Sequence, residues 1–361
     1  MPEARVASGA RRPGPAAAEG GAFAPPGGDA PSVPAVCVVL VNWNGWGDTV
    51  QCLESLLRST GVGLQVVVCD NDSGDGSLDH IQAWAAGRLP AAVDPSHPLA
   101  GLALPPLPKP LRCTRYDRAD AERGGDADAD ADAPLVLVQT GANLGFAGGC
   151  NVGMRFAAAR GHRFVWLLNN DTLVRPDTLL HLVQRAERDP RLGMVGSTLL
   201  SYDGTTVQAL GYGAYNPWLA LPRHIRAGGE RAGARAAYVV GASMLVRREF
   251  LAEVGLLSED YFLFFEELDW AMRAGAAWSL GHAPESVVFH KEGASNGGSS
   301  TGAKSRLADY YFMKNRIVFT RKYFPRRLPT VYLALGVAAA RRALRGDWAR
   351  ARMILDLCRS T

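Results

Sequence analysis

A run of five large apolar residues that ends in Asn-Asn-Asp, at residues 164–171, constrains the fold of this chain more than any other stretch. An uninterrupted apolar run predicts a strand covered on both faces, as in parallel sheets flanked by helices. Residues 172–176 are not expected to continue the ladder because Pro176 lacks an N–H, and Asp177 can cap the helix that follows. The strand therefore delivers three polar side chains to its carboxyl end, where open α/β sheets bind ligands. An Asx turn that serves only the local backbone is the alternative explanation.

The same unit, an apolar run followed by a polar turn and a helical pattern, recurs along the chain. Such alternation predicts an α/β fold with a mostly parallel central sheet flanked by helices. In the first unit, the turn NWNGWGD leads into a helix that Asp48 is expected to cap. A final helix is predicted over residues 307–324. The predicted strands are residues 36–41, 64–69, 135–138, 164–168, 194–200, 238–246 and 286–289.

One main domain with attachments is predicted, because 361 residues with 47% hydrophobic content can bury one large core. Residues 1–33 lack a long apolar run and are expected to be a disordered leader, neither signal peptide nor membrane anchor. The main domain spans residues 34–290, with a low-complexity insertion at 88–133 that is rich in Pro, Ala and Asp and is expected to be a loop. Residues 291–361 are predicted to form a Gly/Ser-rich lid and a basic helical region.

The net charge of +4 is unevenly distributed along the chain. Residues 117–132 hold seven acids and two Arg, whereas residues 304–361 hold fourteen Lys and Arg and three acids. A basic segment interleaved with aromatic residues can bind anionic lipid or nucleic acid, but this one carries no nucleic-acid-binding motif. The uncharged run at 328–340 is too short to span a bilayer, so peripheral contact is the expected membrane association.

Six cysteines are scattered along the chain without CxxC or Cys/His spacing. This pattern favours reduced thiols over disulfides or a zinc site. We therefore expect a cytoplasmic protein that contacts the cytoplasmic face of the inner membrane through its basic C-terminal region.

Candidate catalytic groups occur in two further stretches. FFEELDW places Glu266, Glu267 and Asp269 among bulky rings, and desolvation raises the pKa of a carboxyl group. An amphipathic helix with an Asp269–Arg273 ion pair is the alternative explanation. His290 follows a predicted strand and precedes a Gly/Ser-rich loop, which suits a ligand beneath a lid, although a lone His is more often a satisfied surface residue.

Six motifs, taken in order, resemble glycosyltransferase family 2: VNWNG, CDNDSGDGS, NLGFAGGCN, LLNNDT, FFEELDW and VVFHKEGAS. These inverting enzymes have the GT-A fold of nucleotide-diphospho-sugar transferases. The similarity covers residues 36–325 and is closest to the bacterial rhamnosyltransferase-like and galactofuranosyltransferase-like branch. It implies a GT-A catalytic domain at residues 34–290 with a C-terminal helical extension.

The resemblance implies a metal site at Asn-Asn-Asp, where the family carries its DxD-type motif. Asp171 matches the metal-binding acid, Asn169 stands at the first position of the motif in place of Asp, and His290 is expected to help. Mg²⁺ or Mn²⁺ held there would neutralise the charge that develops on a nucleoside diphosphate leaving group.

The resemblance also places the general base in FFEELDW, with Glu267 as first choice and Asp269 as second. Direct displacement with inversion needs one such base to take the proton of the acceptor hydroxyl. The first two motifs resemble the part of the family that binds nucleobase and ribose, and the third resembles the turn that closes over the nucleotide sugar. The implied substrate-binding residues are Asn42, Asn44, Asp70, Asp72, Asn143, Gly145, Phe146, Gly148, Asn151, Asn170, Glu266 and Trp270.

The expected activity is metal-dependent transfer of a sugar, with rhamnose as the candidate, from a dTDP- or UDP-linked donor. The expected acceptor is a hydroxyl of a cell-envelope glycan or lipid-linked glycan, which suits polysaccharide and cell wall biosynthesis, and no nucleic-acid partner is expected. A sugar-1-phosphate nucleotidyltransferase is one alternative, but that class usually carries a basic residue in the first loop, and NWNGWGD has none. A catalytically silent carbohydrate-binding scaffold is the other alternative.

Overall fold

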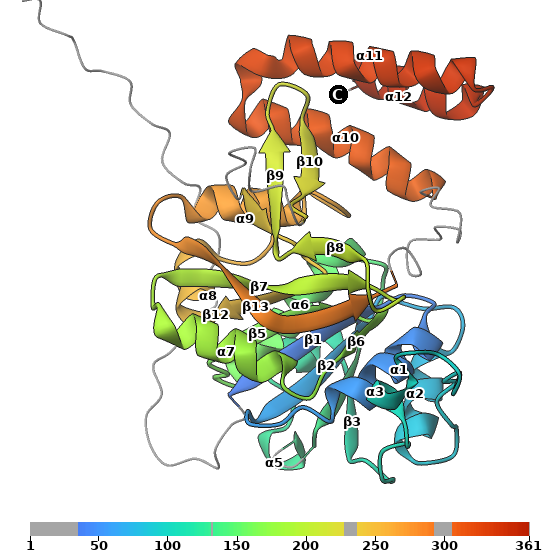
Figure 1. Cartoon of the computed structure of the whole chain (residues 1–361), viewed down its shortest axis with the longest axis vertical. Coiled ribbons are helices and arrows are strands. Elements are labelled where there is room, and N and C mark those ends of the chain that lie inside the picture. The colour runs from blue at the N-terminus through green and yellow to red at the C-terminus, as the bar shows by residue number, and fades with distance from the viewer. Residues whose placement is uncertain (1–34, 131–132, 227–236, 292–304, 361) are drawn as a thin grey trace, which may run out of the picture.

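The computed structural model describes residues 35–130, 133–226, 237–291 and 305–360. The predicted leader at 1–33 and nearly all of the predicted lid lie outside these ranges. A central sheet lies among helices, and three C-terminal helices gather at one end of the molecule (Figure 1). The strands are β1 (Val36–Asn42), β2 (Leu64–Asp70), β3 (Cys113–Asp117), β4 (Leu135–Gln139), β5 (Phe164–Asn169), β6 (Thr172–Val174), β7 (Leu192–Ser201), β8 (Val207–Leu210), β9 (Tyr212–Asn216), β10 (Leu221–His224), β11 (Tyr238–Val239), β12 (Ser243–Arg247) and β13 (Ser279–His290). The helices are α1 (Trp46–Leu56), α2 (Ser77–Ala85), α3 (Ala100–Ala103), α4 (Arg118–Glu122), α5 (Ala127–Asp130), α6 (Gly145–Ala159), α7 (Thr178–Arg188), α8 (Arg248–Val254), α9 (Glu266–Ala274), α10 (Arg306–Tyr323), α11 (Leu328–Leu344) and α12 (Trp348–Ser360).

The central sheet has the strand order β3-β4-β2-β1-β5-β12-β7-β13-β6, and β8 pairs with β7 beside this path. The first five strands run parallel to their neighbours, and β7 runs parallel to β13. Within the described part of the central sheet, antiparallel pairing is confined to β12, β6 and β8, and a second, three-stranded sheet, β10-β9-β11, is antiparallel. The prediction of a mostly parallel α/β sheet is therefore confirmed.

The apolar runs are strands covered on both faces, as predicted. In β1, Val36, Val38 and Leu40 face a core that α1, α2 and α7 cover. Cys37 and Val39 face a second core beneath α6 and α8. Fully burying an aliphatic side chain is worth about 1.5–3 kcal/mol, so this two-sided burial fixes the sheet between its helix layers. The ends of the central strands are therefore held rigidly where the polar turns begin.

The expectation that residues 88–133 form a loop is wrong for part of that segment. Cys113–Asp117 is β3, the parallel neighbour of β4 at the sheet edge. An edge strand has one hydrogen-bonded neighbour and is only partly covered, so it lacks the apolar run that marked the central strands. Buried Glu54 of α1 also anchors the segment, because it accepts hydrogen bonds from the Leu107 N–H (2.8 Å) and Lys109 Nζ (3.3 Å).

The bounds of several predicted strands also need correction, and the strand predicted at 286–289 begins at Ser279. Residues 238–246 form two strands, β11 and β12, rather than one, because the strand conformation is interrupted around Gly241, whose N–H bonds Glu267. Thr172–Val174 does form a strand, β6, although it pairs with β13 rather than extending the ladder of β5. Pro176 lies beyond β6, so its missing N–H is not needed there.

The predicted helix caps differ in detail from the structure. The first helix, α1, begins at Trp46 after an N-cap at Gly45, so Asp48 lies in its first turn and forms an ion pair with Lys291. Asp177 does occupy the N-cap of α7, but its side chain makes no capping hydrogen bond. An acid in the first turn still suits the positive end of the helix dipole.

The predicted C-terminal helical extension is α10, α11 and α12. A separate core joins these helices to each other and to Ala220 in the turn of the β9–β10 hairpin, which projects towards them (Figure 1). Asn315 of α10 donates hydrogen bonds of 2.9 Å to the carbonyl oxygens of Leu263 and Phe264 in the main domain. Among the described residues, no helix has the length and apolar character needed to cross a membrane.

All six cysteines lie in the described residues and each is a free thiol, as expected. Four of them are buried in the cores of the sheet. Burial raises the pKa of the Cys52 thiol to about 12, and that of Cys69 to about 12 as well. These thiols are therefore core residues rather than nucleophiles.

Candidate active site

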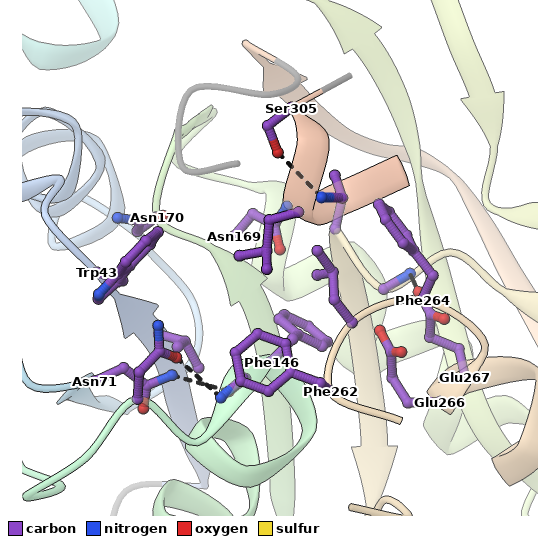
Figure 2. A pocket seen from close by; sticks show the side chains of 18 residues that line it. Trp43, Asn71, Phe146, Asn169, Asn170, Phe262, Phe264, Glu266, Glu267 and Ser305 are labelled. Carbon is purple, nitrogen blue, oxygen red and sulfur yellow. Dashed lines mark hydrogen bonds between the residues drawn. The ribbon is translucent and has the colours of Figure 1, made fainter. Parts of the chain in front are cut away.

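A cleft opens beyond the carboxyl ends of β1, β2 and β5, where the strand pattern placed a ligand site (Figure 2). It holds about 970 Å³ of space, a volume that includes the part open to solvent. Its walls come from strand ends, the start of α6, the loop before α9 and the start of α10. Seven predicted site residues line the cleft: Asn143, Gly145, Phe146, Asn169, Asn170, Glu266 and Glu267.

The Gly-rich turn before α6 packs closely against the loop before α9. Gly145 has a φ of +70°, and a Cβ at this position would lie 2.3 Å from the Phe262 carbonyl oxygen. The next N–H, of Phe146, donates to that same oxygen over 2.8 Å. Gly148 and Asn151 do not line the cleft; Asn151 instead donates to the Leu257 carbonyl over 3.0 Å. These two residues therefore support the wall rather than form it.

The four residues predicted to contact nucleobase and ribose build a turn beside the cleft. Asn42 and Asp70 are fully buried, and Asn42 Nδ2 donates to Asp70 Oδ1 over 2.6 Å. Asn44 Oδ1 accepts the Gly74 N–H over 2.8 Å, and Asp72 is exposed. Asn44 and Asp72 both adopt positive φ, which Asn and Asp tolerate better than most residues. None of the four lines the cleft.

Asp171 and His290 meet beside Asn169, but neither of them lines the cleft. Asn169 Nδ2 lies 3.2 Å from His290 Nε2, and Asp171 Oδ1 lies 3.2 Å from the same nitrogen. Asp171 is 2% exposed, and no donor among the described residues makes a hydrogen bond of good geometry to its Oδ1. Burial raises the pKa of Asp171, but its contacts with His290, a backbone hydrogen bond and the nearby charge of Lys291 together outweigh burial and hold that pKa below its usual value. Asn170 turns towards β1 and donates to Thr49 Oγ1 over 2.9 Å.

Glu266 and Glu267 begin α9 and lie on the side of the cleft opposite Trp43 (Figure 2). The two residues before them, Phe264 and Phe265, have φ values of 69° and 77°. Left-handed backbone at a bulky residue costs on the order of 1–3 kcal/mol and is concentrated at functional sites. This bend turns both glutamates towards the cleft.

The two carboxylates have different surroundings. Glu267 Oε1 accepts the Gly241 N–H over 3.1 Å, whereas Glu266 Oε2 is buried without a hydrogen-bond partner among the described residues. Burial raises the pKa of both groups, and the charge of Glu267 raises that of Glu266 further. Two close carboxyls do not both ionise easily, and the hydrogen bond from the Gly241 N–H favours ionisation of Glu267 over Glu266.

Asp269 and Trp270 do not line the cleft. Asp269 is fully buried and binds three donors: Arg273 Nε at 2.8 Å, Lys322 Nζ at 2.7 Å and Tyr323 OH at 2.8 Å. The Asp269–Arg273 ion pair, which was the alternative explanation of this helix, is therefore present. Trp270 is a fully buried core residue.

Comparison with known proteins identifies the family. Residues 121–311 match the family described as glycosyltransferase like family 2, a segment that includes most walls of the cleft. The chain belongs to this family. As a family 2 glycosyltransferase it has the GT-A type of α/β fold and transfers a sugar. This assignment favours sugar transfer over both alternatives, the nucleotidyltransferase and the silent scaffold.

Curated relatives of this glycosyltransferase include an enzyme of Mycobacterium tuberculosis, present in strains CDC 1551 / Oshkosh and ATCC 25618 / H37Rv. It is N-acetylglucosaminyl-diphospho-decaprenol L-rhamnosyltransferase, 28% identical over 235 residues that cover 58% of this chain and 76% of the relative. Among solved structures, the mannosyltransferase PcManGT from Pyrobaculum calidifontis, in complex with GDP-Man and Mn²⁺, has a TM-score of 0.49 and 16% identity, over 91% of this chain and 87% of that one. S. aureus TarS residues 1–349 in complex with UDP-GlcNAc has a TM-score of 0.48 and 14% identity, over 90% and 91%.

Several wall residues of this glycosyltransferase escaped the sequence analysis. Trp43 and Asn71 line the side opposite the glutamates, and the only signal for them was their place in polar turns at strand ends. Ser305 and the start of α10 close another side, and no spacing in the sequence relates them to the rest of the site. The Phe262 and Tyr311 rings stack at 4.5 Å and hold that helix against the loop before α9.

Proposed function

We propose that this glycosyltransferase catalyses inverting transfer from a nucleoside-diphosphate sugar, with Glu267 as general base. The observation that carries this proposal is the shared cleft, in which Glu266 and Glu267 lie opposite Asn169 and Asn170 at the end of β5 (Figure 2). Glu267 would take the proton of the acceptor hydroxyl while that oxygen attacks the anomeric carbon and the diphosphate leaves. Its raised pKa makes it a stronger base near neutral pH than an ordinary carboxylate.

Neutral Glu266 would donate a hydrogen bond to a sugar hydroxyl in the cleft. Its Oε2 is buried and unpartnered among the described residues, and burial of a polar group without a partner costs about 1–3 kcal/mol. A bound sugar would relieve that cost. On the opposite side, the Trp43 ring offers a face on which a nucleobase can stack, and Asn71 lies beside it (Figure 2).

Asp171 and His290 fit one divalent cation. Two neighbouring ligands of an octahedral ion at about 2.1 Å lie about 3.0 Å apart, close to the 3.2 Å between Asp171 Oδ1 and His290 Nε2. No group of three or more His, Cys, Asp or Glu in the described part of the chain is placed to hold a metal. The remaining ligands would be diphosphate oxygens and water, as is usual for Mg²⁺. Bound there, the ion would neutralise charge on the leaving diphosphate.

The curated relative supports a proposal for the donor and the acceptor. Its name describes transfer of L-rhamnose onto an N-acetylglucosaminyl-diphospho-decaprenol. We therefore propose a dTDP- or UDP-linked sugar, with rhamnose first, as donor, and a hydroxyl of a lipid-linked cell-envelope glycan as acceptor. A lipid-linked acceptor supports our proposal that the reaction takes place at the cytoplasmic face of the inner membrane.

Peripheral membrane contact is proposed for an apolar face on α11 and α12, which consists of Leu333, Val337, Leu344, Trp348 and Leu355. Each of these side chains is exposed, with Leu344 88% and Trp348 71% exposed. Leu333, Val337 and Leu344 share one side of α11 because they follow each other at helical spacing. The exposed arginines Arg341, Arg345 and Arg352 accompany this face. Apolar side chains beside cationic ones suit an anionic lipid surface.

A donor panel tests the proposed reaction. The purified protein is incubated with labelled dTDP-rhamnose and UDP-sugars, Mn²⁺, and a polyprenyl-diphosphate N-acetylglucosamine acceptor. We expect release of nucleoside diphosphate only with one donor and only when acceptor is present, and loss of that release in excess EDTA. Release that is independent of acceptor, or unaffected by EDTA, would overturn the transfer or the metal dependence respectively.

A further inference from the structure

We infer that Gln208 is a positioning residue that keeps the proton of neutral His290 on Nδ1 and so leaves the Nε2 lone pair facing Asp171. Gln208 lies in β8 and was not among the residues that the sequence singled out. The expected effect on metal binding rests on the proposed metal site, but the tautomer of His290 can be measured without metal.

Two hydrogen bonds clamp the Gln208 amide to His290. Gln208 Nε2 donates to the His290 carbonyl oxygen over 2.9 Å, which fixes the orientation of the amide. Gln208 Oε1 is then the atom that lies 3.0 Å from His290 Nδ1. Because a carbonyl oxygen can only accept, Nδ1 must carry the hydrogen. Gln208 is only 6% exposed, so water does not compete for this contact.

A bulge in the sheet aims Gln208 at the histidine. Leu199 of β7 pairs with Ala209, but its neighbour Leu200 pairs with Val207. Gln208 is therefore the extra residue between two registered pairs. Bulges of this kind are common beside active sites, where they redirect a side chain. β7 also pairs with β13, the strand that ends at His290, so β7 alone lies between the bulge in β8 and that strand.

The far side of the imidazole agrees with this assignment. His290 Nε2 lies 3.2 Å from Asn169 Nδ2, an atom that can only donate, so Nε2 is the acceptor nitrogen. Asp171 Oδ1 lies 3.2 Å from the same nitrogen. Two electron-rich atoms at this distance suit a shared cation. Without the clamp, the proton could move to Nε2 and bond Asp171, which would occupy the positions that the metal needs.

Nitrogen NMR tests the tautomer directly. Uniformly ¹⁵N-histidine-labelled wild-type protein should show His290 with Nδ1 protonated, the signal being assigned by its absence in His290→Asn. In Gln208→Met, which has similar size but no acceptor, we expect the proton to shift to Nε2. Gln208→Glu restores an acceptor opposite Nδ1 and should restore the wild-type pattern.

Binding of Mn²⁺ alone, followed by EPR of the free ion, tests the consequence. We expect affinity to fall roughly 10–100-fold in Gln208→Met, as for other residues that orient metal-binding histidines, and to recover in Gln208→Glu. Gln65→Met is the matched control, since buried Gln65 Oε1 also faces a histidine, His162 Nε2 at 3.3 Å, in the core. It should leave Mn²⁺ affinity unchanged.

The outcomes separate this inference from the proposed function. Nδ1 protonation and Mn²⁺ affinity that both persist in Gln208→Met would overturn the inference, as would an equal loss of affinity in Gln65→Met. If the tautomer shifts in Gln208→Met as predicted but the wild-type protein binds no Mn²⁺, the positioning role is supported and the proposed metal site is overturned instead.

Discussion

The two glutamates at the start of α9 differ in what holds them, and this difference predicts different variants. Glu267 faces the Gly241 N–H, which favours its ionised form, whereas Glu266 has no such donor at Oε2 among the described residues. We expect Glu267→Gln to retain donor binding and to lower transfer by about 10²–10⁴-fold, the usual contribution of a general base. Glu266→Gln still offers a hydrogen-bond donor and should lower the rate of transfer less than Glu267→Gln does. If Asp269→Asn lowers the rate of transfer more than the other two variants while donor binding is unchanged, the general base is Asp269 instead.

The raised pKa of Glu266 also predicts a dependence of stability on pH. A carboxyl whose pKa is higher folded than unfolded binds more protons in the folded state between those two values. Its contribution to stability is therefore complete below the unfolded pKa, near 4.3, and is lost as pH rises towards the folded pKa. We expect the melting temperature of the wild type to fall as pH rises above the unfolded pKa, and Glu266→Gln to flatten this fall. If melting temperature depends on pH in the same way in both proteins, the raised pKa of Glu266 would be contradicted.

Asp171 carries the third prediction at this scale. Asp171→Asn should abolish turnover while leaving the fold intact, because a neutral amide supplies no charge to hold a cation beside the diphosphate. Circular dichroism checks the fold, and product release at saturating Mn²⁺ checks turnover. A wild-type rate in this variant would remove the metal from the mechanism.

At the scale of elements, apolar runs predicted the central strands well, because a strand buried on both faces needs an apolar residue at nearly every position. The same logic could not find β3, because an edge strand such as Cys113–Asp117 is only partly covered. It also could not divide residues 238–246, where the interruption at Gly241 lets its N–H donate a hydrogen bond to Glu267. The polar strand ends indicated the site, yet Asn42 and Asp70 are buried and do not line the cleft. Contacts between distant segments, such as α10 with the loop before α9, leave no local pattern.

Asp269 shows how one acid can join two elements. It lies in α9 and binds Lys322 and Tyr323 of α10, which forms part of the cleft wall. We expect Asp269→Asn to destabilise the protein by about 3 kcal/mol, because removing one partner of a buried ion pair leaves the others uncompensated. Thermal unfolding measures the loss. A donor affinity close to wild type at low temperature would agree with a structural role, whereas loss of donor binding without loss of stability would not.

At the scale of the whole molecule, α10 links two surfaces with different tasks. Its first turn closes the cleft, and its later turns pack in one core with α11 and α12, which carry the exposed apolar face. A protein that rests on this face would hold its cleft at a fixed position relative to the bilayer. Such an arrangement suits an acceptor whose glycan is tethered to a lipid.

Sedimentation with liposomes tests this arrangement. Each Arg near an anionic surface contributes about 1 kcal/mol, so the arginines along α11 and α12 together with the apolar face should give reversible, salt-sensitive binding. Leu344→Glu places a charge at the most exposed position of the face and should weaken binding to anionic vesicles several-fold. Met272→Glu adds the same charge at a partly exposed position of α9 and should not. Equal binding by the two variants, or binding by the wild type that ignores both anionic lipid and salt, would show that this face does not meet the membrane.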